Sequence, residues 1–313
     1  MKNDNDKESD LNNPHDSGFR DFFSERRVAQ SFLRENLPAS IAKQLDYRTL
    51  KISKDTFIDK QLIPSQSDLL YEIKYKNLPL LLYLLFEHKS YQDWLVAFQL
   101  LKYMVRIWEL YLKQHEGAKK LPAILPLVIY HGKSEWRISK RFGDLMDIPV
   151  ELEPHIPDFD YRLYDISHLP DEEIKGTVLL RIILMTFKYI YSPDLRHHLV
   201  DIFKLFGEIK NKTKGLEYLE ALLRYLTASA DTITPEVLQE SLAQSIKDGG
   251  DIMPTIAQQW MQQGRQEGME SKEWFVVKNS LLMGLSIETI AKLTGLPVKR
   301  IEQMKTQLDP GTK

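Results

Sequence analysis

Residues 67–89 read SDLLYEIKYKNLPLLLYLLFEHK, and this stretch decides the fold. Its two ends, 67–75 and 80–89, are rich in aliphatic and aromatic residues and are typical of β-strands. Between them, Lys76-Asn77-Leu78-Pro79 is a short turn signal. The stretch therefore predicts a β-hairpin.

The register of this hairpin brings two carboxylates together. If the turn centres on Asn77 and Leu78, paired residues have numbers that sum to 155, and Asp68 lies opposite Glu87. Directly opposed residues have Cβ atoms roughly 5 Å apart, and like charges at that distance repel. A half-buried sheet keeps such a pair when a cation sits between the carboxylates. The sequence therefore predicts a metal site, with Mg²⁺ as the expected ion.

Lys89 follows Glu87 by two residues. Side chains alternate along a strand, so both lie on the same face, and the ammonium falls beside the expected metal. Carboxylates that hold Mg²⁺ and a lysine that orients or deprotonates water are the parts of a metal-dependent phosphodiesterase. An ordinary amphipathic hairpin with polar residues at its wet ends is the alternative that these three residues alone leave open.

The surrounding segments predict an α/β core. Residues 16–37 have the pattern of an amphipathic helix, residues 49–58 contain a first strand, and residues 123–130 form an apolar strand buried on both faces. With the hairpin, the order is helix, three strands, helix, strand. The second helix is predicted over 93–114, and the apolar stripe expected to face the core consists of Trp94, Phe98, Leu101, Val105, Trp108 and Leu112.

Several segments together carry a resemblance to a known family. They are His15-Asp16 with Phe19 and Phe22, and the stretches 67–71 (SDLLY), 84–90 (LLFEHKS), 101–108 (LKYMVRIW) and 125–132 (LPLVIYHG). Across about residues 14–300 the chain resembles the recombination-promoting nuclease (Rpn) and transposase-like family of bacteria, within the PD-(D/E)XK nuclease superfamily. The resemblance implies an αβββαβ core of the restriction-endonuclease type, a helical C-terminal region and Mg²⁺-dependent cleavage of DNA.

Transferred to this sequence, the resemblance implies a role for each residue of the site. Asp68 and Glu87 would hold Mg²⁺, for which Mn²⁺ would substitute. The backbone carbonyl of His88 would add a third oxygen, and Lys89 would assist the attacking water. Ser67 stands where the superfamily has the proline that gives it its name. A non-catalytic DNA-binding or regulatory protein that keeps the fold is the alternative from another class.

The composition of the 313 residues is that of a globular protein. The chain has no cysteine, which excludes disulfides and thiolate metal sites and leaves hard oxygen ligands. No apolar run reaches the roughly 20 residues of a membrane span, and the polar first residues are unlike a signal peptide. We therefore expect a cytoplasmic protein without a membrane partner.

The net charge of −2 at pH 7 is unfavourable for a protein that binds DNA, since phosphate contacts supply most of the non-specific affinity. A local basic surface can compensate. On the helix predicted over 93–114, the face opposite the apolar stripe carries Gln99, Lys102 and Arg106, which we expect to follow a phosphate backbone. A solvated helix face of mixed charge is an equally good interpretation.

The pattern also predicts how the chain is divided. We expect a disordered segment over 1–13, a nuclease core over 14–170 with an extra strand within 158–166, a helical region over 171–250, a flexible helical arm over 251–283 and a hairpin of two helices over 284–313. The arm is polar on most faces and contains glycines, which cost roughly 1 kcal/mol each inside a helix.

The last segment has the pattern of a helix-turn-helix. Ser286 can cap one helix, Gly295 can end it, and Pro297 can open the next. A hairpin that packs on the arm or forms a homodimer is the alternative, because no third helix is visible to complete a domain. In the DNA-binding interpretation, the residues of the second helix that contact phosphates and a base edge are Lys299, Arg300, Gln303 and Lys305.

Overall fold

The computed structural model describes residues 14–52, 69–76, 81–230, 232–246, 276–278, 280–281 and 285–308. The chain divides into two compact units, Met1–Gly249 and Gly250–Lys313. Within the described ranges, none of the helices combines the length and the apolar character that crossing a membrane requires.

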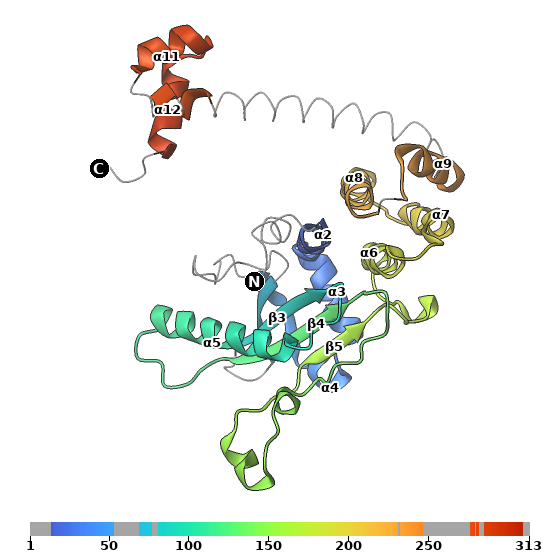
Figure 1. Ribbon diagram of the computed structural model, residues 1–313. Helices are drawn as coiled ribbons and strands as arrows, with labels where there is room; N and C mark the ends of the chain where they lie inside the picture. Colours follow the sequence, from blue (N-terminus) through green and yellow to red (C-terminus); the bar gives the residue numbers. More distant parts are fainter. Residues whose placement is uncertain are drawn as a thin grey trace. The chain divides into compact units, whose positions relative to one another are not determined.

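The first unit is built on a five-stranded mixed sheet (Figure 1). β1, β2 and β3 pair antiparallel, whereas β4 runs parallel to β3 and β5 runs parallel to β4. Helix α5 (Val96–Gln114) makes the crossover between β3 and β4 that a parallel pair requires. The α/β core is therefore confirmed, in the predicted order of elements. The strands follow the order of the chain and are β1 (Leu45–Ile52), β2 (Leu69–Tyr75), β3 (Leu81–Lys89), β4 (Ala123–Tyr130) and β5 (Arg162–Asp165).

The β2–β3 hairpin has the predicted register. The numbers of its paired residues sum to 155, from Leu69 opposite Phe86 to Lys74 opposite Leu81. Asp68 lies outside the described residues, so its pairing with Glu87 stays a prediction.

The N-terminal segment forms two long helices where one was predicted. α2 (Pro14–Phe23) and α3 (Arg26–Asn36) are separated at Glu25, whose backbone is extended. Phe19 of α2 stacks on a ring of β3, whereas Phe32 of α3 packs edge to face on a ring of β5. The break lets the two apolar faces reach different strands, which one straight helix would not do. A short helix, α4 (Ala39–Ala42), then leads into β1, which begins at Leu45, four residues earlier than the segment predicted to hold it.

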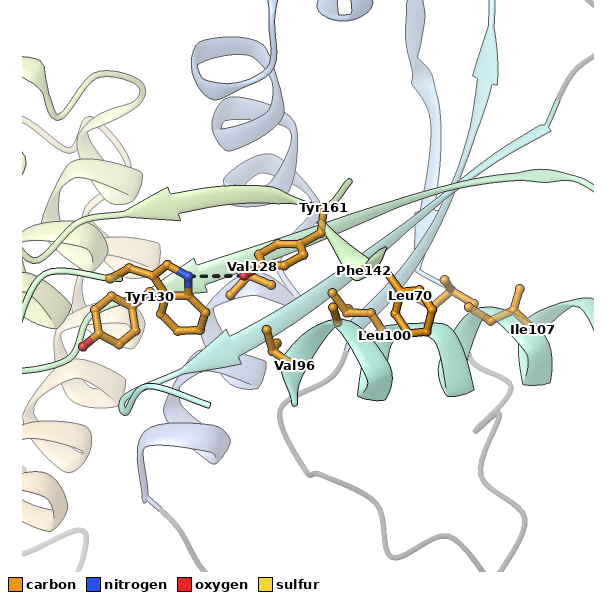
Figure 2. Packing of buried hydrophobic residues seen from close by; sticks show 10 residues of the cluster. Leu70, Val96, Leu100, Ile107, Val128, Tyr130, Phe142 and Tyr161 are labelled. Carbon is orange, nitrogen blue, oxygen red and sulfur yellow. Dashed lines mark hydrogen bonds between the residues drawn. The ribbon is translucent and has the colours of Figure 1, made fainter. Parts of the chain in front are cut away.

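Helix α5 covers one face of the sheet, but not with the predicted stripe. The prediction is wrong for four of the six residues, since Trp94 and Phe98 are 65% and 47% exposed and Val105 and Leu112 are exposed as well. Leu101 of the predicted stripe does pack against the core. Apolar residues occupy two stripes of this helix, so periodicity alone does not choose between them. Figure 2 shows the packing that forms against Leu70 of β2 and Val128 of β4, to which α5 contributes Val96, Leu100 and Ile107.

The extra strand expected within 158–166 is present as β5. It follows an irregular segment with two short 3₁₀ helices, η2 (Phe142–Leu145) and η3 (Val150–His155). Tyr161, just before β5, belongs to the cluster under α5, where its hydroxyl accepts a hydrogen bond from Trp136 Nε1 at 3.2 Å (Figure 2). The segment is thus fixed to the core by aromatic side chains.

Helices complete the first unit after the sheet. Thr177, Asn211 and Thr234 cap α6, α8 and α9 with side-chain oxygens. Gly18 of α2 lies against the ring of Tyr225 in α8, where any side chain would collide with that ring. The structure is helical over most of the predicted helical region, 171–250. The elements are η4 (Asp171–Glu173), α6 (Val178–Tyr189), α7 (Leu195–Phe206), α8 (Lys212–Ser229) and α9 (Pro235–Ser245).

The second unit contains α11 (Ile287–Thr294) and α12 (Val298–Leu308). Ser286 accepts a hydrogen bond from the backbone of Thr289, and Gly295 ends α11 with φ at 72°, as predicted. Most of the arm predicted over 251–283 lies outside the described residues, but its described end is helical and packs on the hairpin, as one of the alternatives expected. Helical residues at 276–278 and 280–281 precede the hairpin, and the buried core that they share with it consists of Val277, Ile290, Ile301 and Met304.

Candidate active site

The predicted site includes the last three residues of β3, Glu87, His88 and Lys89. Glu87 pairs with Val128 in the sheet, and its side chain, like Asp68, lies outside what the structure describes. His88 and Lys89 are both buried, at 3% and 5% exposure. Because side chains alternate along a strand, the two point to opposite faces of the sheet.

The Lys89 ammonium is held by two side chains from the start of α5 and the loop before it. Its Nζ lies 3.1 Å from Asp93 Oδ2 and donates a 2.9 Å hydrogen bond to Gln99 Oε1. Gln99 Nε2 in turn donates to the Tyr103 hydroxyl at 2.8 Å. A buried ammonium requires a counter-charge and hydrogen-bond acceptors, and this network supplies both. It fixes the position of Lys89 at the end of the strand.

Asp93 is a residue that the sequence analysis missed. Its spacing of four residues from Lys89 was the only signal, and such spacing is informative within a helix, whereas Asp93 precedes α5. The Asp93 side chain is 20% exposed, so the ion pair extends from the buried ammonium toward the surface.

The residues expected on a DNA-facing side of α5 separate into two groups. Gln99 is half-buried and directed at Lys89, which gives it a positioning role within the site. Lys102 is exposed, and Arg106 forms an ion pair with Glu109 at 2.7 Å. Contacts of these three side chains with DNA stay a prediction.

His88 belongs to a cluster on the other face of the sheet. Its ring stacks on His131 at 4.6 Å and on Phe19 at 4.7 Å. Burial lowers the pKa of His88 to about 3, and burial also holds the pKa of His131 well below its usual range. Both rings are therefore neutral at physiological pH, and they stack on aromatic neighbours. His15 closes the cluster through a 2.9 Å hydrogen bond between its Nδ1 and the hydroxyl of Tyr225.

The predicted metal site rests on side chains that lie outside the described part of the chain. Among the side chains that are described, no group of three or more histidines, aspartates and glutamates is arranged to hold a metal. Asp68 and Glu87 are not in that set, and the carbonyl of His88 is a backbone group. Two carboxylates and a carbonyl are the hard oxygen donors that suit Mg²⁺, so the donor chemistry fits the ion.

Two carboxylates near β5 have structural partners instead. Asp158 lies 2.6 Å from Arg141 Nε, and this hydrogen-bonded partner lowers the pKa of the Asp158 carboxyl. Asp165 accepts hydrogen bonds from the backbone of Trp136 and of Ser167. These contacts bind the segment before β5 and the residues that follow this strand to their neighbours in the fold.

One glutamine joins the two loops that leave the sheet beside Lys89. Gln92 Nε2 donates to Ser134 Oγ and to the carbonyl of Glu135, each at 3.0 Å, and its Oε1 accepts from the backbone of Arg137 at 3.1 Å. The loop after β3 is thereby bound to the loop after β4. No motif in the sequence pointed to this contact.

The C-terminal residues expected to contact DNA lie together on α12. The three cations and the glutamine named for this role are all exposed, while Ile301 and Met304 of the same helix are buried in the small core. The helix thus presents a basic face outward, and DNA binding by this face stays a prediction.

Comparison with known proteins places these features in a family. The family described as "Putative transposase, YhgA-like" matches residues 13–217. The recombination-promoting nuclease RpnA of Escherichia coli (strain K12) is 28% identical over 284 residues, which cover 90% of this chain and 94% of RpnA. RpnC of the same organism is 27% identical over 93% of this chain and 96% of its own length. The inactive recombination-promoting nuclease-like protein RpnE, also from that strain, is 27% identical over 92% of this chain and 96% of its own. No solved structure matches the chain.

Proposed function

Because this chain belongs to the YhgA-like transposase family, we propose that it is a metal-dependent DNA endonuclease that hydrolyses phosphodiester bonds, as in recombination or transposition. The observation that carries the proposal is the end of β3, where a buried lysine is fixed beside the strand position of Glu87. A buried charge is costly, so a buried lysine at this position is a candidate for a functional group. The names of RpnA and RpnC support the same type of activity.

The proposal includes a divalent metal held by Asp68 and Glu87, with the carbonyl of His88 as a third oxygen. Leu69 and Phe86, the chain neighbours of the two carboxylates, are paired in the sheet, which supports their opposition. When bound, Mg²⁺ or Mn²⁺ would polarise the phosphate and lower the pKa of water.

Lys89 acts on the attacking water in this proposal. Asp93 and Gln99 fix the position of the Lys89 ammonium. The lysine is therefore already placed to orient the attacking water toward the phosphorus atom. Tyr103 fixes the Gln99 amide in turn, and it is a positioning residue.

The order of strands and helices supports a PD-(D/E)XK type of core. Three antiparallel strands, a crossover helix and a parallel fourth strand form the αβββαβ arrangement that the resemblance implies. DNA is the proposed substrate, and α12 and the exposed side of α5 are its proposed contacts. A cytoplasmic location, where that substrate is found, belongs to the same proposal.

A second candidate function is a non-catalytic DNA-binding or regulatory protein with the same fold. The similarity to RpnE, whose name marks it as inactive, favours this alternative. Incubation of the purified protein with supercoiled plasmid separates the two. An endonuclease converts the plasmid to nicked or linear forms in the presence of Mg²⁺ and leaves it unchanged in EDTA. The variant Glu87→Gln should lack this activity. Unchanged plasmid with Mg²⁺ and with Mn²⁺, together with retained DNA binding, would establish the alternative.

The C-terminal hairpin has two proposed roles, contact with DNA and formation of a homodimer. Sedimentation of the full chain and of a chain ending at residue 283 distinguishes them. A dimer that becomes a monomer on truncation assigns the hairpin to self-association, whereas an unchanged oligomeric state argues against a homodimer formed by the hairpin.

A further inference from the structure

A groove lined by arginines lies between α3 and β1, at the edge of the sheet. Its volume is about 340 Å³. Four of its six lining residues are arginines and none is a carboxylate, in a chain whose net charge is −2. The lining residues are Arg26, Arg27, Gln30, Arg34, Tyr47 and Arg48.

Backbone contacts explain part of this groove. β1 is an edge strand, and Arg26 Nη2 donates to the carbonyls of Tyr47 and Arg48. Gln30 Nε2 also donates to the Tyr47 carbonyl, at 2.5 Å. These two side chains cover polar groups of the edge strand that would otherwise be open to a foreign strand. The same reason does not apply to Arg27 or Arg34.

Two of the remaining guanidinium groups are held by neighbouring side chains, and the third is exposed. Arg34 lies over the ring of Tyr47, 4.3 Å from its centroid, and this stacking fixes its plane. Arg48 is paired with Asp46, its neighbour on the same strand, at 3.1 Å, and its side chain is 91% exposed. Arg27 is exposed beside them on α3. Because guanidinium groups offer paired donors that match phosphate oxygens, an array of them on one face suits a polyphosphate ligand.

The groove and the proposed cleavage site are connected through the sheet. Ile52, the last residue of β1, pairs with Tyr71, which follows Asp68 by three residues along the chain. Arg48 precedes Ile52 by four residues, in a part of β1 where the pairing with β2 is irregular, so its backbone lies at most roughly 13 Å from that of Ile52. DNA carries a phosphate about every 3.4 Å on each strand, so a duplex of several nucleotides spans this part of the sheet edge.

We propose that this arginine groove binds the phosphate backbone of duplex DNA outside the cleavage site. The ligand is recognised by its charge and spacing and not by its base sequence. The inference rests on the proposed endonuclease function for the identity of the ligand. Binding of DNA in this groove requires neither a metal nor cleavage of the DNA.

The test measures DNA binding in EDTA, so that cleavage plays no part. The variant Arg27→Gln/Arg34→Gln/Arg48→Gln removes three charges and leaves Arg26 on the edge strand. We expect the slope of log affinity against log salt to become shallower by up to about 3, near 0.9 for each lost phosphate contact. The matched control removes three exposed cations on α7 or just after it, as Arg196→Gln/Lys204→Gln/Lys210→Gln.

Equal slopes for wild type and groove variant, or an equal change in the control, would overturn the proposal. Thermal unfolding of each variant verifies that the chain is folded, and the single variant Arg27→Gln serves if the triple variant is not. Titration with inorganic phosphate separates a small anion from DNA: a groove-dependent signal for phosphate with an unaltered DNA slope would also refute a DNA site. A changed slope in a protein that never cleaves plasmid would reject the endonuclease and keep the groove.

Discussion

Replacing Asp93 by asparagine removes the counter-charge of the buried Lys89 ammonium but keeps a side chain of nearly the same shape. The side chains of Lys89 and Asp93 are 6% and 20% exposed, and their charged atoms lie 3.1 Å apart. Loss of one partner of a fully buried pair costs about 3–5 kcal/mol. Since Asp93 is partly exposed and Gln99 still accepts a hydrogen bond, we expect Asp93→Asn to cost about 2–3 kcal/mol.

The partner variant gives the opposite result. Lys89→Met removes the charge that needs compensation, so its stability should lie within about 1 kcal/mol of wild type. In the double variant Lys89→Met/Asp93→Asn, most of the cost of Asp93→Asn should disappear. At roughly 2–4 °C per kcal/mol for a unit of this size, Asp93→Asn lowers the melting temperature by about 4–12 °C.

Thermal and urea unfolding of the four proteins measure this coupling directly. Equal destabilisation by Asp93→Asn in the presence and absence of Lys89 would refute the assignment of Asp93 as the counter-charge. Single-turnover cleavage adds a second readout. Asp93→Asn should slow the reaction, and Lys89→Met should abolish it although the protein is stable.

Three further outcomes are expected. Gln99→Ala should slow cleavage by roughly tenfold with unaltered metal affinity, because it frees the Lys89 ammonium without removing it; a parallel loss of metal binding in calorimetry contradicts this role. The free energy of unfolding should fall as the pH drops from about 6.5 toward 3, because His88 and His131 take up protons in the unfolded chain but stay neutral in the folded one. The loss is up to about 1.4 kcal/mol per pH unit for each of the two histidines. The variant His131→Phe should flatten this acid limb in urea titrations, and an unchanged limb opposes the assignment. Deletion of residues 284–313 should make the salt slope of DNA binding shallower by up to about 2–3 while cleavage at saturating DNA persists; an unaltered slope assigns the hairpin to packing.

The β-hairpin was predictable because its information is local. A short turn signal between two apolar segments fixes the register, and one residue of slip would turn every side chain to the wrong face. The observed pairing of Leu69 with Phe86 follows from that rule. The caps of α11, Ser286 and Gly295, were predictable for the same reason, since they depend on neighbouring backbone groups.

The packing of α5 was not predictable from periodicity. Two apolar stripes lie on this helix, and the sheet rather than the helix decides which one is buried. The packing of the predicted arm on the C-terminal hairpin was left open for a related reason. Val277 follows a polar, glycine-containing stretch, and its burial becomes visible only when Ile290 and Ile301 are placed around it. The ion pair between Lys89 and Asp93 was also not predictable, because Asp93 lies in a loop whose conformation the sequence pattern does not fix.

In the proposed function, Glu87 holds a catalytic divalent metal beside Lys89. Titration of the wild type, Glu87→Gln and Lys89→Met with Mn²⁺, followed by cleavage of plasmid with each protein, tests it most directly. We expect Glu87→Gln to lose both metal binding and cleavage, whereas Lys89→Met should bind the metal as the wild type does and should not cleave. Metal binding and cleavage by Glu87→Gln at wild-type levels would contradict the claim.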